Sequence, residues 1–241
     1  MKIITWNCKM KFREDYKLIF PYNPDVLIIQ ETEDINTIDF GDYSSDVSGV
    51  LWIGENPKKG LGVICFNGYE VSLHENYKSE FKYVLPLILS RDTFKCNLIG
   101  VWTQKVGVKT KTHKNYIRQF KLSIKCYESL FSLDDVIICG DFNSNLIWEN
   151  PFRIDKDHRE VIDKLEQKKI FSSYHHYFNE EQGRETRPTF YYHHKKEKPF
   201  HIDFCFLSLK LLNKLENVEV GNYDDWIKHS DHVPIIVTLK D

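Results

Sequence analysis

The sequence predicts an α/β (α+β) protein in which two β-sheets pack face to face and helices cover their outer faces. Eight short apolar runs have the length and β-branched content of strands, and three segments have helical periodicity. Two distant segments also share one plan, in which a helix precedes a strand that ends in polar residues. So many strands fit one domain if each sheet buries one face on the other and its second face under helices.

The strand candidates are apolar runs of four to seven residues separated by turn residues. They cover 2–6, 26–30, 61–66, 84–90, 97–102, 136–139, 202–207 and 233–239. Runs this short are typical of strands and fall well below the length of a membrane span.

Helical periodicity is clearest over 116–131, where apolar residues recur at spacings of four, four, three and four on one stripe: Tyr116, Phe120, Ile124, Tyr127 and Phe131. A second helix is predicted over 158–169, with Val161, Ile162 and Leu165 facing inward, and a third over 11–20.

The repeated plan appears in "PDVLIIQETE" (24–33) and "LDDVIICGDFN" (133–143). In each, an acid precedes a short apolar strand, and acidic or amide side chains follow it. Each segment also follows a helix candidate. Two related halves of this kind would place both strand ends at one rim of the protein.

Length and composition indicate one domain that spans residues 1–241. No Pro/Gly/Ser-rich linker divides the chain, and the apolar fraction of 41% and charged fraction of 28% are those of a globular protein. The net charge of −2 argues against a generally basic nucleic-acid coat protein. Basic residues nevertheless cluster: 95–125 holds eight Lys/Arg and no acid, and Lys195, Lys196 and Lys198 form a second group. Charge alone fits either a solvated face or phosphate contact.

The six cysteines form no CxxC pair, and most lie inside apolar runs. This pattern indicates buried free thiols in a reducing compartment. The N-terminus has too short an apolar run for a secretory signal. We therefore expect a soluble cytoplasmic protein that has no membrane association and no evident obligate protein partner.

Polar side chains gather at five predicted strand edges. They are Asn7, Glu31, Asp141 with Asn143, Asp203, and Asp231 with His232. A single such residue can be explained by a turn, because Asx side chains hydrogen bond to nearby backbone groups. Several carboxylates brought together are costly unless a cation neutralises them. Carboxylate and amide oxygens are the ligands that Mg²⁺ prefers, which leaves positions for water and phosphate.

The motifs "ITWNC", "LIIQETE", "CGDFNS", "HIDFCFLS" and "SDHVPIIV" occur in this order over almost the whole chain. In this combination they resemble the endonuclease/exonuclease/phosphatase superfamily, which includes AP endonucleases, DNase I-like nucleases and inositol polyphosphate phosphatases. The resemblance implies a four-layer α/β/β/α sandwich with two packed mixed sheets. It also implies Mg²⁺, with Mn²⁺ as an alternative, and hydrolysis of a phosphodiester by metal-assisted attack of water.

The resemblance also implies roles for the residues that match. Glu31 is expected to bind the metal directly, with Asn7 and Asp231 at the same metal site. Asp141 is expected to activate or orient the attacking water, and Asn143 to hold the phosphate and Asp141. His232 is expected to contact the scissile phosphate while Asp203 orients it.

The chain departs from AP endonucleases at several positions. Lys9 and Met10 follow the first motif, where those enzymes have an acid or amide and then "GLR". Glu33 replaces the lysine of "QETK", and His201 replaces the arginine that precedes the conserved Asp segment. The catalytic motifs therefore match, whereas the substrate class is open.

DNA is the substrate that the basic and aromatic residues near these motifs favour. Five residues are expected to bind it, because lysines contact phosphates and aromatic rings stack on bases. They are Trp102, Lys105, Lys109, Lys111 and Tyr192. The same groups could hold an inositol phosphate, a phospholipid head group or another small phosphoester. A third alternative is a non-catalytic metal-binding protein that uses the ten His and six Cys residues, although their spacing matches no common zinc pattern.

Overall fold

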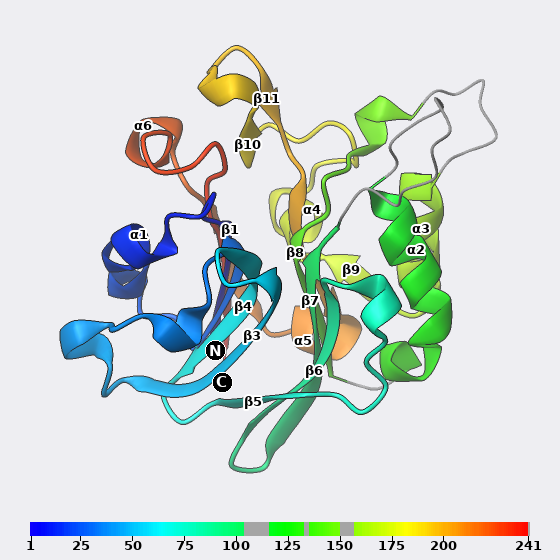
Figure 1. Ribbon diagram of the computed structural model, residues 1–241. Helices are drawn as coiled ribbons and strands as arrows, with labels where there is room; N and C mark the ends of the chain where they lie inside the picture. The colour runs from blue at the N-terminus through cyan, green and yellow to red at the C-terminus, as the bar shows by residue number, and fades with distance from the viewer. Residues whose placement is uncertain (104–115, 133–134, 150–156, 241) are drawn as a thin grey trace.

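Two six-stranded β-sheets form the centre of the protein (Figure 1). The structure is a computed structural model that describes residues 1–103, 116–132, 135–149 and 157–240. The first sheet has the strand order β13-β14-β1-β2-β4-β3, and the second has the order β5-β6-β7-β8-β12-β9. All eight predicted strands are present, and each lies in one of these two sheets.

The first sheet is mixed, because β1 pairs in parallel with β2 and antiparallel with β14. Its strands are β1 (Lys2–Asn7), β2 (Val26–Thr32), β3 (Val47–Asn56), β4 (Lys59–Phe66), β13 (Leu215–Val220) and β14 (Ile235–Leu239). The interior strands β1, β2 and β4 are almost completely buried, which explains why their sequences are continuous apolar runs.

The second sheet is mixed as well, because β8 pairs in parallel with β7 and antiparallel with β12. Its strands are β5 (Glu70–Leu73), β6 (Val84–Arg91), β7 (Phe94–Trp102), β8 (Val136–Asp141), β9 (Ile170–Ser172) and β12 (Asp203–Ser208). A separate small hairpin consists of β10 (Phe190–Tyr191) and β11 (Pro199–Phe200).

Helices cover the two outer faces. In Figure 1, α1 (Phe12–Ile19) and α6 (Tyr223–Trp226) lie beside the first sheet, whereas α2 (Ile117–Cys126) and α3 (Asp157–Gln167) lie beside the second. Two short helices, α4 (Ser173–Phe178) and α5 (Leu209–Leu212), complete the described set. The helix predicted over 116–131 ends at Cys126, and a 3₁₀ turn over Glu128–Ser132 replaces its last part. None of the described helices is long and apolar enough to cross a membrane.

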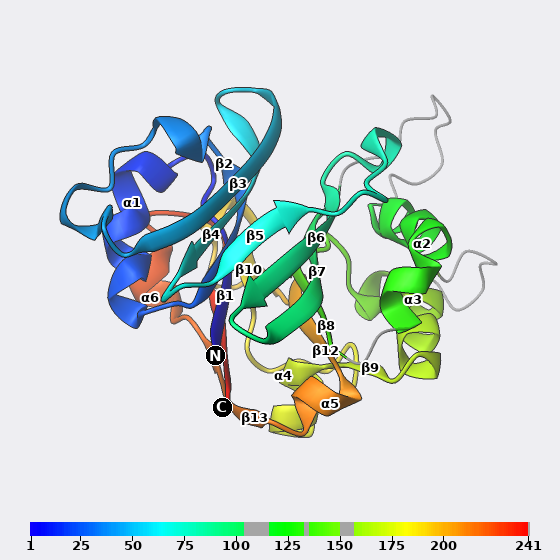
Figure 2. The ribbon, with the colours of Figure 1, turned by 90° about the horizontal axis from the view of Figure 1, so that it is seen from below.

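Three hydrophobic clusters separate the four layers. Ile28, Leu61 and Leu98 belong to the cluster between the sheets. The first sheet packs on α1 through a second cluster that includes Phe12 and Phe20. The third cluster joins the second sheet to α2 and α3 and fills the space around Phe142. Figure 2 shows the same layers from below, and the predicted α/β/β/α sandwich is confirmed.

The repeated plan in the sequence corresponds to two β-α-β units. Helix α1 connects the parallel strands β1 and β2, and α2 lies between the parallel strands β7 and β8 in the chain. Because parallel strands end at the same edge of their sheet, the polar residues that close β1, β2 and β8 lie at one rim. This rim is where the candidate site forms.

Replacing Gly140 by alanine is expected to lower the free energy of unfolding by about 3 kcal/mol or more. Gly140 has a φ of +149°, and an added Cβ would lie 1.9 Å from the carbonyl oxygen of Val101. Urea denaturation measures the effect. Gly100→Ala is the matched control, because a Cβ there would meet Leu61 at an ordinary 3.5 Å. Equal stabilities of the two variants would contradict this account of Gly140.

Candidate active site at the rim of the two sheets

Two hydrogen bonds between side chains join the sheets at this rim. Asn7, the last residue of β1, donates from Nδ2 to Oδ2 of Asp141 in the other sheet over 3.0 Å. His232, just before β14, has its Nδ1 2.9 Å from Oδ2 of Asp203 on β12. All four side chains are buried. The interface between the two sheets is therefore polar at this edge, whereas hydrophobic side chains fill its centre.

The antiparallel register of β8 and β12 places Asp141 directly opposite Asp203. Ligand atoms of Asp141, Asp203 and His232 lie within 4.8 Å of one another. Two carboxylates and one imidazole are thus concentrated in a dry environment, where their charges interact strongly.

Burial, together with the nearby charge of Asp203, raises the pKa of Asp141 to about 7. Hydrogen bonds oppose this rise: Asn7 donates to Oδ2, and the backbone N–H of Asn143 donates to Oδ1 over 2.8 Å. Asp141 can therefore exchange a proton near neutral pH, as a general base must.

His232 shows the opposite behaviour. Burial opposes its positive charge, but the carboxylates of Asp203 and Asp141 outweigh burial and raise the pKa of His232 to about 9. The carboxylate of Asp203 accepts the Nδ1 proton, so the other ring nitrogen is directed away from the pair. At neutral pH the imidazolium is a hydrogen-bond donor suited to a phosphate oxygen.

Asn143 is placed by an unusual backbone conformation. Its φ is +47°, and its Nδ2 donates to Oδ2 of Asp141 over 2.9 Å. Asparagine tolerates the left-handed region better than most residues, which explains its place after a strand end. Phe142 points the other way and packs against Phe120, Phe204 and Phe206. The polar pair Asp141 and Asn143 and the buried phenylalanine between them thus have separate environments.

The three residues expected at the metal are near the rim but are not all brought together. Glu31 is the second-last residue of β2 and has a φ of +58°. Its Oε2 lies 2.9 Å from Nζ of Lys59. Asp231 Oδ2 lies 3.1 Å from Nζ of Lys9.

Glu31, Asp231 and the amide oxygen of Asn7 are hard oxygen donors of the kind that Mg²⁺ prefers. One oxygen of Asp203, Oδ1, is buried with no hydrogen-bond partner among the described residues. The donor set therefore fits a divalent ion.

Within the described part of the chain, Asp141, Asp203 and His232 form the one group whose ligand atoms lie at metal-binding distances. Apart from His232, none of the described histidines belongs to such a group. His201, for example, is buried with its Nδ1 2.8 Å from the carbonyl oxygen of Arg187, and burial lowers its pKa.

Among the expected substrate-binding residues, the structure places two. Tyr192 is exposed beside His193, with ring centroids 4.0 Å apart, so its ring is accessible. Trp102 is only 4% exposed and packs on Tyr83 at 4.7 Å, while Nζ of Lys59 lies 5.1 Å from the ring centroid. Trp102 is thus a core residue beneath the rim. Lys105, Lys109 and Lys111 lie outside the described residues.

Three hydroxyl groups that sequence reasoning missed hydrogen bond to the backbone of the candidate site residues or of their neighbours. Ser230 donates to the carbonyl oxygen of Asn7 and accepts from the backbone of His232. Thr189 accepts from the backbone N–H of Asp203. Thr103 donates to the carbonyl oxygen of Phe142. Ser230 stands within the "SDH" motif, but only the fold shows why a hydroxyl is needed there.

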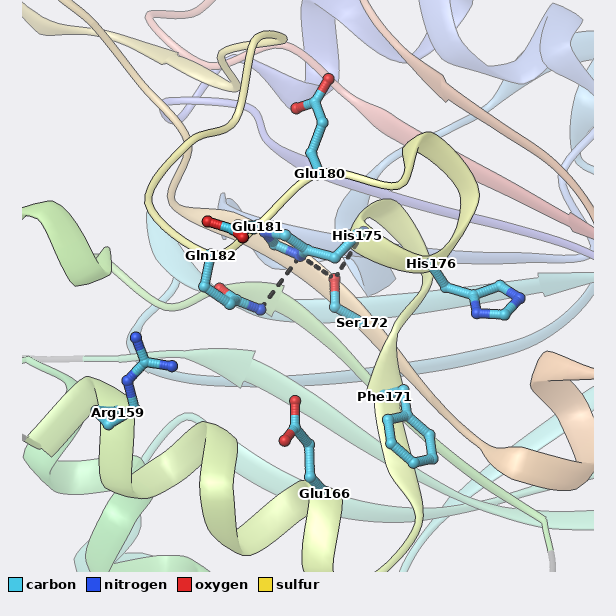
Figure 3. A pocket seen from close by; sticks show the side chains of 9 residues that line it. All are labelled: Arg159, Glu166, Phe171, Ser172, His175, His176, Glu180, Glu181 and Gln182. Carbon is cyan, nitrogen blue, oxygen red and sulfur yellow. Dashed lines mark hydrogen bonds between the residues drawn. The ribbon is translucent and has the colours of Figure 1, made fainter.

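A separate cavity of about 410 Å³ lies away from this rim (Figure 3). Residues from α3, β9, α4 and the following turn line it, and none of them is a predicted site residue. In Figure 3 the ring of His175 bonds to Ser172, at 2.7 Å, and to Gln182. Ser172 is the N-cap of α4. The polar side chains here therefore stabilise a helix start.

Comparison with solved structures gives 16% identity and a TM-score of 0.70 to an AP endonuclease from Archaeoglobus fulgidus, over 100% of both chains. A 3'-5' exonuclease from Neisseria meningitidis matches with 15% identity and the same TM-score and coverage. An AP endonuclease from Leishmania major matches with 15% identity and a TM-score of 0.72, over all of this chain and 87% of its own. No protein-family model and no curated protein matches the chain. The chain therefore has the same fold as these AP endonucleases and this exonuclease.

Proposed function

We propose that this chain is a divalent-metal-dependent phosphoester hydrolase that cleaves phosphodiester bonds in DNA. The observation that carries the proposal is that ligand atoms of Asp141, whose pKa is near neutral, and of a protonated His232 lie within 4.8 Å of each other in one buried cluster. A base and a cationic donor held this close match the needs of phosphoryl transfer, in which water must be activated and charge on oxygen neutralised.

Each residue has a separate task in this proposal. Asp141 accepts a proton from the attacking water, while Asn7 and Asn143 hold its carboxylate in place. The Nε2–H of His232 stabilises the negative oxygen of the phosphate, and Asp203 keeps the imidazole charged and oriented. Glu31, Asn7 and Asp231 would hold Mg²⁺, or Mn²⁺, which supplies Lewis-acid stabilisation of the phosphate when bound.

DNA is the proposed substrate on three grounds. Solved structures with this fold include AP endonucleases and a Neisseria protein bound to a product DNA hairpin. Residues 104–115, which come after β7 in the sequence, include four lysines. Tyr192 offers an exposed ring near Phe190, which itself lies 4.7 Å from His232 between ring centroids. A small phosphomonoester is the second candidate, because one of those structures is described as a 3' phosphatase.

A substrate panel tests the choice. Supercoiled plasmid, an abasic duplex, an inositol polyphosphate and sphingomyelin are each incubated with the protein and Mg²⁺. Cleavage of the plasmid or the abasic duplex is the expected result. Hydrolysis of the inositol phosphate or the lipid with no cleavage of DNA would contradict the proposed substrate and leave the hydrolase assignment intact.

The six free cysteines also support the reducing, cytoplasmic location that we propose.

The imidazole of His232 is expected to titrate near pH 9 in the metal-free protein, because its carboxylate neighbours outweigh burial. A raised pKa means that the charged form stabilises the fold below about pH 6.5 and that this contribution is lost as the pH rises towards 9. NMR titration of the histidine resonances measures it. In Asp203→Asn the pKa of His232 should fall, because burial remains while its nearest carboxylate partner is lost. A wild-type pKa at or below 6.5 would contradict the assignment.

A further inference from the structure

Lys9 lies at the candidate site, although the family pattern has no cation there. Its Nζ is 3.1 Å from Oδ2 of Asp231 and 2.6 Å from Nε2 of His194. Its backbone N–H donates to Oδ1 of Asn7. Lys9 therefore contacts two of the three residues expected to hold the metal.

The second partner of Lys9 is fixed by its own hydrogen bond. Nδ1 of His194 is 3.0 Å from the carbonyl oxygen of Ile227. A carbonyl only accepts, so Nδ1 carries the proton and Nε2 is free to accept from the ammonium group of Lys9. The carbonyl of His194 in turn accepts from the hydroxyl of Tyr223. The ammonium group is thus held between a carboxylate and a neutral imidazole.

The backbone that carries Lys9 is strained. Lys9 and Met10 are consecutive non-glycine residues with φ of 52° and 63°. Such conformations cost of order 1–3 kcal/mol each and persist only where the surroundings enforce them. Here Met10 N donates to the carbonyl oxygen of Glu31 over 2.9 Å, so the turn is fastened to the next strand end. The strained turn directs Lys9 towards Asp231.

Glu31 also has an ammonium partner, Lys59, whose contacts differ from those of Lys9. Lys59 lies 2.9 Å from Oε2 of Glu31, and its Nζ otherwise faces the ring of Trp102. Three cationic groups, His232, Lys9 and Lys59, therefore face four carboxylates across the site. Among the described residues, the ammonium group of Lys59 forms one ion pair, with Glu31. The ammonium group of Lys9 contacts both Asp231 and His194, and its backbone is fixed in the turn.

We propose that Lys9 is a resident cation that takes the place of the metal at Asp231, which revises the role of Asp231 as a metal ligand; a divalent ion is then held on the Glu31 side alone, and Lys9 binds the substrate phosphate directly. The inference rests on the proposed function. Its physical basis is that Asp231 is already neutralised and that an ammonium group repels a divalent ion at short range. Two positive charges on opposite sides can then hold one phosphate.

The test compares wild type with Lys9→Met, which keeps the length of the side chain and removes its charge. Mn²⁺ binding is measured by isothermal titration calorimetry without substrate. Lys9→Met is expected to bind Mn²⁺ at least about fivefold more tightly, or to bind a second ion, because Asp231 is released.

Binding of a nicked DNA duplex in EDTA is the second readout. Here Lys9→Met is expected to bind at least about fivefold more weakly, and its salt dependence should fall by about one phosphate contact. Lys9→Met is thus expected to strengthen Mn²⁺ binding and to weaken duplex binding, whereas the loss of a purely structural residue would weaken the binding of both ligands. Lys9→Arg should keep the duplex affinity.

Lys11→Met is the matched control, since Lys11 is exposed two residues away and its Nζ lies 3.5 Å from the carbonyl oxygen of Lys228. Unchanged Mn²⁺ and duplex affinities in Lys9→Met would overturn the inference, and so would a loss of both. The proposed function fails on a separate result, namely a wild-type protein that hydrolyses no phosphoester with any divalent ion.

Discussion

Replacing His232 by alanine is expected to lower kcat by at least about two orders of magnitude on any phosphodiester that the protein cleaves. The imidazolium is the one buried cationic donor in the central cluster, and its charge is maintained by Asp203 and Asp141. Removing it deprives the transition state of a donor in a site from which water is largely excluded. Steady-state kinetics should show the loss mainly in kcat.

The fold of His232→Ala should survive, because Asp203 can take up a proton once its partner is gone. Circular dichroism and a thermal melt check this directly. A variant that stays folded and cleaves at the wild-type rate would refute the role of His232.

Asp141→Asn is expected to reduce kcat by about two to four orders of magnitude, because the amide cannot accept the proton of the attacking water. The substitution preserves the size of the side chain and the acceptor for Asn143 N–H. It also removes a carboxylate that burial and Asp203 disfavour. The KM should change less than kcat, since Asp141 acts on water and not on the bound substrate.

The Asp15–His229 pair provides matched controls for both substitutions. Nδ1 of His229 lies 2.8 Å from Oδ1 of Asp15, close to the 2.9 Å of the Asp203–His232 pair. Asp15 is also buried, yet within the described part of the chain neither residue belongs to the group formed by Asp141, Asp203 and His232. His229→Ala and Asp15→Asn should therefore alter stability and leave kcat within about threefold of wild type. Losses as large as those of the site variants would show that kcat follows general stability.

Interior strands were predictable because they are buried on both faces and read as apolar runs. The missed strands lie towards the sheet edges or are short. β3 contains Gly49 and Gly54 and is mostly half-exposed, and β13, "LENVEV", alternates polar and apolar residues. Periodicity over a few half-exposed residues carries too little signal to separate such strands from loops.

For the site, the residues next to strand ends were predictable because topology brings parallel strand ends to one rim. Their cationic partners were not. Lys9 and Asp231 are 222 positions apart, and no local pattern connects them. The prediction for Trp102 was wrong for a related reason. Its position at the end of the predicted strand 97–102 suggested that its ring is exposed at the rim, but the ring packs on Tyr83. Side-chain direction at the last residue of a strand depends on tertiary packing.

We propose that this cluster hydrolyses phosphodiesters with the help of a divalent ion. The rate of cleavage of an abasic DNA duplex by the wild-type protein, measured with Mg²⁺, after EDTA and after restoring Mg²⁺, tests it most directly. The account predicts cleavage with Mg²⁺, none in EDTA and recovery when Mg²⁺ returns. Cleavage that persists in EDTA, or that is unchanged in Asp141→Asn, would contradict it.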